Sequence, residues 1–153
     1  MPRVAVTEIP ARTPQPGLLK RVQEILAVGR LRSEKDLVKL VEEGLATDAI
    51  EGLRRSGMTD KEIFSLIVPR RTLTHRRARR EALSPEESDK AVRLARMTAL
   101  AEHVFGDRGR ALPWLRIAKQ QFGGRSPIQL MATEAGARLV EELLYRIDEG
   151  MAA

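Results

Sequence analysis

Apolar residues recur at intervals of three and four along most of the chain, which predicts an all-α protein of short helices. The first four predicted helices follow a common pattern, in which a serine or threonine caps several starts and a glycine follows several ends. In the second of them, Leu37, Val38 and Val41 are expected to face inward. These helices begin near Leu18 and after Ser33, Thr47 and Thr59, and Thr59 with Glu62 has the spacing of a capping box.

The clearest helix in the sequence is predicted from Pro85 to Phe105. Ser84 and Glu87 have the spacing of a capping box, and proline suits the first helical turn. At 1.5 Å per residue this helix spans roughly 30 Å, long enough to link two modules. Its expected inward face consists of Ala91, Leu94, Ala95, Thr98, Ala101 and Phe105.

The segment from Trp114 to Gly150 is predicted to form helical pieces around a tight turn at Gly123–Gly124. Ser126 is expected to cap a short helix that starts at Pro127, with Gln129 as its capping-box partner, and Thr133 to cap the next one. The last helix has an apolar stripe, and Gly136 on that stripe would allow another backbone to approach closely. The stripe comprises Leu139, Val140, Leu143, Leu144 and Ile147.

A strongly basic stretch follows two short predicted helices, which is typical of a helix-turn-helix whose later helix enters the major groove of DNA. No acidic residue occurs between Glu62 and Glu81, whereas a solvated surface helix usually mixes both charges. Arginine suits phosphates and guanine edges. A merely solvated face is the alternative reading. The expected DNA contacts are Arg70, Arg71, Thr72, Thr74, His75, Arg76, Arg77, Arg79 and Arg80.

Composition narrows the remaining possibilities. The chain has 153 residues, with 27 lysines and arginines against 21 acidic residues, and a net charge of +6 that suits a nucleic-acid partner. Aromatic residues make up only 3%, which disfavours recognition of single strands by base stacking. Apolar runs are too short for a membrane span, and the proline-rich start does not resemble a signal peptide. We therefore expect a soluble, cytoplasmic protein with a flexible arm over residues 1–17.

No arrangement of residues in the sequence indicates catalysis. Cysteine is absent, and the two histidines, His75 and His103, lie in different predicted helices without metal-ligand spacing. The carboxylate pairs near the end of the chain fall on adjacent helical positions, which point in different directions. We expect no enzyme activity, no metal site and no cofactor.

The order of motifs in the last third resembles the C-terminal toxin-binding domain of the Xre/MbcA/ParS family of antitoxins. The similarity is carried by Trp114-Leu115, the turn Gly123-Gly124, Ser126-Pro127, a Thr133–Gly136 step, and Arg146-Ile147 before Gly150. Arg71 to Arg76 also resembles the family's element at the start of the recognition helix. Pro113 and Ala118 depart from the family pattern. The resemblance implies toxin contacts from Trp114, Ser126, Pro127, Thr133, Glu142, Tyr145, Arg146, Asp148, Glu149, Gly150 and Met151.

The resemblance also implies a domain organisation and partners. After the arm we expect a helix-turn-helix module over residues 18–95, then a toxin-binding domain over 96–153, linked by the long helix. The implied partner is an NAD-consuming toxin of the RES or ParT kind, with an ADP-ribosyltransferase-like fold, whose active-site cleft the C-terminal end would block. Operator DNA, a homodimer and a toxin–antitoxin hetero-oligomer are further expected partners. The alternative is a stand-alone transcriptional regulator whose C-terminal domain dimerises or senses a ligand.

Charge is divided between these parts. Residues 69–80 carry six arginines and no acidic residue, whereas residues 126–153 carry five acidic residues and two arginines. Such a division suits two partners of different charge. It agrees with DNA at the basic helix and a protein at the C-terminal end.

Overall fold

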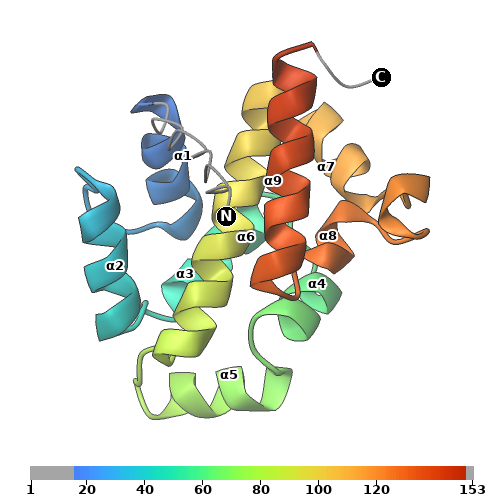
Figure 1. The fold of residues 1–153 in the computed structure, drawn as a ribbon. Coiled ribbons are helices and arrows are strands. Elements are labelled where there is room, and N and C mark those ends of the chain that lie inside the picture. Colours follow the sequence, from blue (N-terminus) through green and yellow to red (C-terminus); the bar gives the residue numbers. More distant parts are fainter. Residues whose placement is uncertain (1–15, 151–153) are drawn as a thin grey trace, which may run out of the picture.

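The computed structural model of the chain describes residues 16–150, and these residues form an all-α fold, as the periodicity predicts (Figure 1). They contain no β-strand, only an isolated bridge between Lys119 and Arg125. The elements are α1 (Pro16–Leu26), α2 (Glu34–Glu43), α3 (Asp48–Arg55), α4 (Asp60–Leu66), α5 (Arg70–Ala78), α6 (Pro85–Phe105), α7 (Arg108–Arg116), the 3₁₀ helix η1 (Gln120–Phe122), α8 (Pro127–Leu130) and α9 (Glu134–Asp148).

Helix α6 runs through the middle of the molecule, with α1 and α2 on one side and α7 and α9 on the other (Figure 1). Because helices cover it from both sides, its buried positions go beyond the single predicted face and include Ser88, Val92 and Met97. Its small residues allow this close packing, since Ala91, Ala95 and Ala101 are fully buried. One hydrophobic core therefore continues along α6 from the N-terminal helices to α9.

The predicted capping boxes are confirmed. At Ser84 and at Thr59, the side-chain oxygen accepts a hydrogen bond from the backbone N–H three residues later. In each box the glutamate returns the interaction by accepting from the backbone N–H of the capping residue. Each box satisfies amide groups that the first helical turn cannot pair internally, which fixes where α6 and α4 begin.

Gly136 confirms the expected close approach of two backbones. A Cβ atom at this position would lie 2.0 Å from the carbonyl oxygen of Leu130. The absence of a side chain therefore lets the first turn of α9 rest directly on α8. Gly123 and Gly124 have φ angles of 64° and 82°, a conformation that glycine adopts readily, and they form the predicted turn.

Several expected details are wrong. The predicted arm overlaps α1, which begins at Pro16 because proline is favoured in the first helical turn; residues 1–15 lie outside the described residues. The long helix α6 ends at Gly106, and Asp107 caps the following helix α7. Val38 and Leu139 were expected to face inward but are 57% and 49% exposed, because no helix within residues 16–150 covers their sides of α2 and α9.

Candidate functional site

Helices α4 and α5, joined by the short connection 67–69, form the predicted helix-turn-helix. Leu73 is buried and anchors α5 to the core, as expected. On the opposite side of α5, Arg71, Thr74, His75 and Ala78 are all exposed. They recur at three- and four-residue intervals, so they share one outward face of the helix, which we call the outer α5 face.

The arginines of this basic stretch do not all point outward. Arg76 has its Nε atom 2.7 Å from the Glu87 carboxylate on α6, and its side chain is 23% exposed. Arg77 donates a hydrogen bond of 2.6 Å to Glu51 on α3. These two arginines therefore attach α5 to its neighbours, and the expectation that they present free charge to DNA needs this correction.

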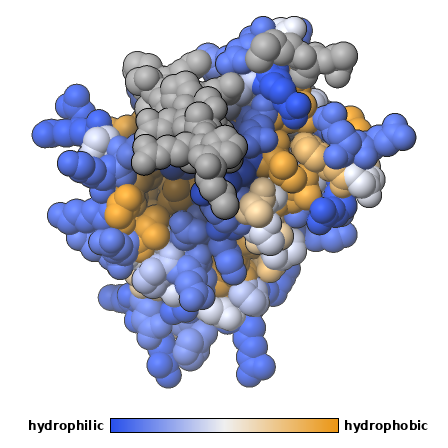
Figure 2. Space-filling view, in the orientation of Figure 1, coloured by the Kyte–Doolittle hydropathy of each residue, from blue (hydrophilic) through white to orange (hydrophobic). Residues whose placement is uncertain are grey.

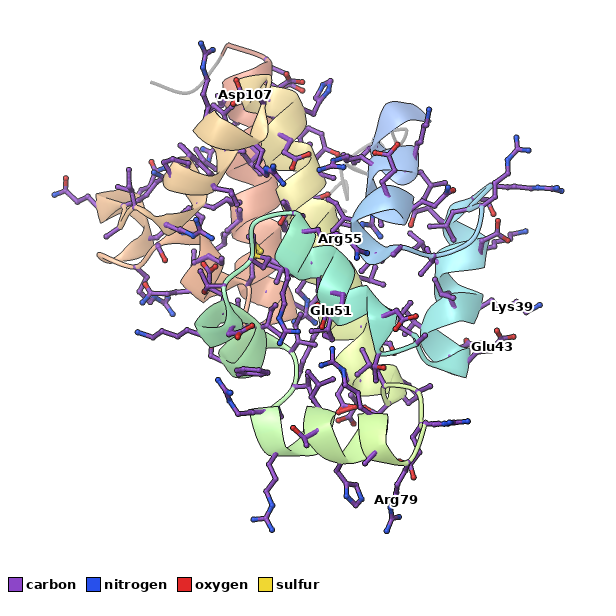
Figure 3. The ribbon with its side chains drawn as sticks, turned by 180° about the vertical axis from the view of Figure 1, so that it is seen from behind. Lys39, Glu43, Glu51, Arg55, Arg79 and Asp107 are labelled. Atoms are coloured by element: carbon purple, nitrogen blue, oxygen red, sulfur yellow. The ribbon has the colours of Figure 1, made fainter. Side chains whose placement is uncertain are left out.

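The other predicted DNA contacts lie around the outer α5 face. Arg70 stacks over the Phe64 ring at 4.7 Å, and Thr72 is half-buried. The Thr74 hydroxyl donates to the Arg70 carbonyl at 3.0 Å. Arg79 is 64% exposed and points away from the body of the protein, as Figure 3 shows, although it lies 3.9 Å from Glu81. Arg80 is exposed, in a left-handed conformation with φ of 55°, just beyond the helix.

At the other end of the chain, the predicted toxin contacts divide into two groups. Ser126 and Pro127 are buried, and Ser126 caps α8 by accepting a hydrogen bond from Gln129. Thr133 caps α9 by accepting from the Gly136 N–H at 3.0 Å. These three residues set the direction of α8 and α9. The buried pair is not available to contact another protein.

The exposed group lies on one side of α9, which we call the outer α9 face. It comprises Arg138, Leu139, Glu142, Arg146 and Glu149, all of which are exposed. Leu139 therefore presents an apolar side chain among charges of both signs. Such a mixture suits a protein partner better than a phosphate backbone, which selects for positive charge alone.

The remaining predicted contacts flank this face. Tyr145 is half-buried and packs against the core, whereas Gly150 is exposed. Asp148 lies 3.9 Å from Nε2 of His103 on α6, so His103 is a surface residue at the junction of two helices. Met151 lies outside the described residues.

Trp114 is half-buried between two neighbours. Its ring centroid lies 5.2 Å from that of Phe105, and the Lys119 ammonium sits 4.7 Å from the ring. Burial lowers the pKa of Lys119 below its ordinary value. One side of the indole thus belongs to the core. Its direct contact with a partner stays a prediction.

A groove of about 210 Å³ lies between α6 and α9. Arg93 and Glu134 line it, but they lie 3.3 Å apart, and Arg93 also pairs with Asp89 at 3.1 Å. Its charges therefore largely satisfy one another. Within residues 16–150, no group of histidine, aspartate and glutamate side chains is arranged to hold a metal ion.

The two candidate surfaces lie at opposite ends of the molecule. In Figure 1, α5 forms the lower end and the last turn of α9 the upper end. Figure 2 shows apolar atoms on the side that carries α7 and α9 and a further apolar patch on the side of α1 and α2, whereas the end with α5 is mostly hydrophilic. No helix within the described part of the chain is long and apolar enough to cross a membrane.

Comparisons with known proteins agree with this division. Residues 100–150 match the model of the antitoxin Xre/MbcA/ParS C-terminal toxin-binding domain, and residues 36–96 match that of the antitoxin Xre-like helix-turn-helix domain. A protein named antitoxin Xre from Pseudomonas putida is 36% identical over 130 residues, covering 85% of this chain and 82% of the relative. Another of that name, from Yersinia enterocolitica, is 34% identical over 118 residues, covering 75% and 80%. Both relatives are named as antitoxins, not as enzymes.

Proposed function

The chain belongs to the Xre/MbcA/ParS family of antitoxins, and on that premise we propose that it neutralises an NAD-consuming toxin with an ADP-ribosyltransferase-like fold. The neutralising element is the outer α9 face together with residues 145–153, which enter and block the active-site cleft of the toxin. The observation that carries this proposal is the exposed, mixed apolar and charged face of α9 within the matched toxin-binding domain.

The geometry of α9 supports this role. Three local features fix the position of α9: Ser126 caps α8, Thr133 caps α9, and Gly136 lets the first turn of α9 pack directly against α8. The outer α9 face is therefore presented by a rigid element, which lowers the entropy cost of binding. Arg146 is exposed near the end of the helix, where its guanidinium can make a polar contact with the toxin.

We further propose that the outer α5 face binds operator DNA and represses the operon. Arg71 and His75 are exposed at the first turns of the second helix of the helix-turn-helix, where base contacts are usually made. Because α5 and the end of α9 lie at opposite ends of the molecule, one chain has room for both partners. Two-fold operators are read by dimers, so the active form is a homodimer, and a toxin–antitoxin hetero-oligomer forms on it.

Neutralisation is tested by co-expressing this chain with the product of the neighbouring gene. The complex is purified through a tag on this chain, and NAD consumption by the partner is measured with and without it. A chain that ends at Tyr145 should fail to protect cells, whereas a chain that ends at Gly150 separates the contribution of α9 from that of residues 151–153. Full protection by the chain ending at Tyr145 would show that this end of the protein does not block the cleft.

DNA binding is tested with a fragment of the operon's own promoter. Fluorescence anisotropy at several salt concentrations gives both the affinity and its salt dependence. Tight binding to the promoter and weak binding to unrelated DNA are expected. Equal affinity for both fragments would favour non-specific attraction by the net positive charge.

A further inference from the structure

Arg116 of helix α7, in the toxin-binding domain, makes several hydrogen bonds to the helix-turn-helix module. Arg116, at the end of α7, donates from Nη2 to the Gly57 carbonyl at 2.7 Å. The same guanidinium donates to both oxygens of the Glu62 carboxylate, at 2.8 and 3.0 Å. This is the two-pronged geometry that arginine forms with a carboxylate and that lysine does not reproduce.

Glu62 also holds the start of α4. Its carboxylate accepts from the Thr59 backbone N–H at 2.9 Å, while the Thr59 side chain accepts from the Glu62 N–H. Burial opposes ionisation of Glu62, but the hydrogen bonds from Arg116 and at Thr59 outweigh it, so that the pKa of this carboxyl lies below its ordinary value. One charged carboxylate therefore serves both the cap of α4 and the attachment to α7.

Two further contacts place α7 along the turn between α3 and α4. Arg108 donates to the Arg55 carbonyl at 2.6 Å. Gly57 lies so close to Leu112 that a Cβ atom there would come within 2.5 Å of its methyl group. Helix α7 thus fixes this turn from three successive helical turns, at Arg108, Leu112 and Arg116.

From these contacts we propose that Arg116 is a positioning residue for operator binding, although it belongs to the toxin-binding domain. The helix-turn-helix match covers residues 36–96 and leaves out α7, yet the start of α4 is held by Arg116. Helix α4 leads through residues 67–69 into α5, so its position sets where the outer α5 face lies. The proposal rests on the DNA-binding part of the proposed function.

Arg116 acts through α4 and does not touch phosphate. Its guanidinium is occupied by Glu62 and Gly57, and it lies on a different helix from the outer α5 face. A residue of this kind affects the affinity for DNA without changing the number of phosphates that the protein neutralises. The slope of log K against log salt measures that number.

The experiment compares the full-length chain with Arg116→Gln, Arg116→Lys and the matched control Arg110→Gln. Arg110 lies on the same helix, its side chain is 77% exposed, and its one ion pair within residues 16–150 is with Asp107. Promoter affinity is measured by anisotropy at four salt concentrations. We expect Arg116→Gln to bind roughly fivefold or more weakly, in the range of coupled sites, with an unchanged salt slope. Arg110→Gln should bind promoter DNA like the wild type. Arg116→Lys keeps the positive charge but cannot donate to both Glu62 oxygens, so it should recover only part of the affinity that Arg116→Gln loses.

Two results would overturn the proposal: undiminished affinity in Arg116→Gln, or a salt slope lower by about one, which would make Arg116 a phosphate contact.

Amide hydrogen exchange in the free protein gives a reading that does not depend on DNA. Arg116→Gln should speed exchange in the first turns of α4 while leaving the middle of α6 unchanged. If the wild type binds no promoter DNA, the proposed DNA-binding function fails. Unchanged exchange in α4 would reject the positioning role itself.

Discussion

The guanidinium of Arg76 on α5 lies 2.7 Å from the carboxylate of Glu87 on α6. Glu87 is also the capping-box partner of Ser84, so this carboxylate joins the start of the longest helix to the basic helix. Burial raises the pKa of Glu87, but the hydrogen bonds from Ser84 and Arg76 lower it by a larger amount. The pKa of Glu87 therefore lies below its ordinary value. A basic residue in the helix-turn-helix thus contributes to the fold.

The first prediction separates the two kinds of arginine on α5. Arg76→Ala should lower the free energy of unfolding by about 1–2 kcal/mol, because it leaves the buried Glu87 carboxylate without its arginine partner. Arg71→Ala, on the outer α5 face, should change stability by less than about 0.5 kcal/mol. Conversely, Arg71→Ala should weaken promoter binding and reduce the salt slope by about one. Urea unfolding and anisotropy measure the two effects.

Arg71 and Arg76 carry the same charge, so each serves as the control for the other. If both variants lower the salt slope equally and neither alters stability, the inward position of Arg76 has no energetic consequence. The interpretation of the basic stretch as an undivided DNA surface would then stand.

Local signals in the sequence were sufficient to predict the helix boundaries that depend on them. The capping boxes at Thr59, Ser84 and Ser126 were all confirmed, because each needs only four consecutive residues in a defined order. The turn at Gly123–Gly124 was confirmed for the same reason. These features fix the all-α fold and the direction of α9.

Contacts between distant segments were not predictable from the same signals. Arg77 pairs with Glu51, and Arg116 pairs with Glu62, at sequence separations of 26 and 54 residues. Helical periodicity also assigned Leu139 to the inward face, since it reports which residues are apolar but not how many neighbours surround a helix. In the sequence, all the arginines of the basic stretch therefore looked equally available to DNA. The tertiary contacts separate Arg76 and Arg77, which pair with glutamates, from the exposed Arg71.

The second prediction concerns Gly136. Gly136→Ala should destabilise the protein by about 2–3 kcal/mol, since the new methyl group would collide with the Leu130 carbonyl and push α9 away from α8. Gly17→Ala is the matched control, because Gly17 also lies in a helix but has open space around it. That substitution should be neutral or stabilise by up to about 1 kcal/mol. Equal effects in thermal unfolding would mean that α8 and α9 are not in close contact.

The third prediction is a loss of stability in acid. The pKa values of Glu51, Glu62 and Glu87 all lie below the ordinary value of 4.5. Burial raises each of them, but hydrogen bonds from arginines, together with those at Thr59 for Glu62 and at Ser84 for Glu87, lower them by more. A depressed carboxyl pKa stabilises the fold above the pKa of the unfolded chain, and this contribution is lost as the pH falls through the folded pKa. The urea midpoint should therefore hold steady from pH 7 down to about 5 and fall below about 4.5.

Substitution of one carboxylate identifies the source of this dependence. Glu62→Gln should have a lower urea midpoint than the wild type at neutral pH, because the Arg116 guanidinium loses the carboxylate to which it donates two hydrogen bonds. Its midpoint should then fall less on acidification than that of the wild type. A parallel fall in both proteins would assign the acid sensitivity to other groups.

The fourth prediction tests the outer α9 face through its apolar residue. Leu139→Gln should weaken toxin binding by about tenfold or more, since burial of a leucine side chain contributes about 1.5–3 kcal/mol and a tenfold change in affinity is about 1.4 kcal/mol. The substitution should hardly affect stability, because Leu139 is 49% exposed in the free protein. Val38→Gln is the matched control, an equally polar replacement of an exposed apolar residue on α2, outside the matched toxin-binding domain. Titration of the purified toxin by calorimetry measures both affinities. If Val38→Gln weakened binding and Leu139→Gln did not, the toxin would bind the side of the molecule formed by α1 and α2, and the outer α9 face would lose its proposed role.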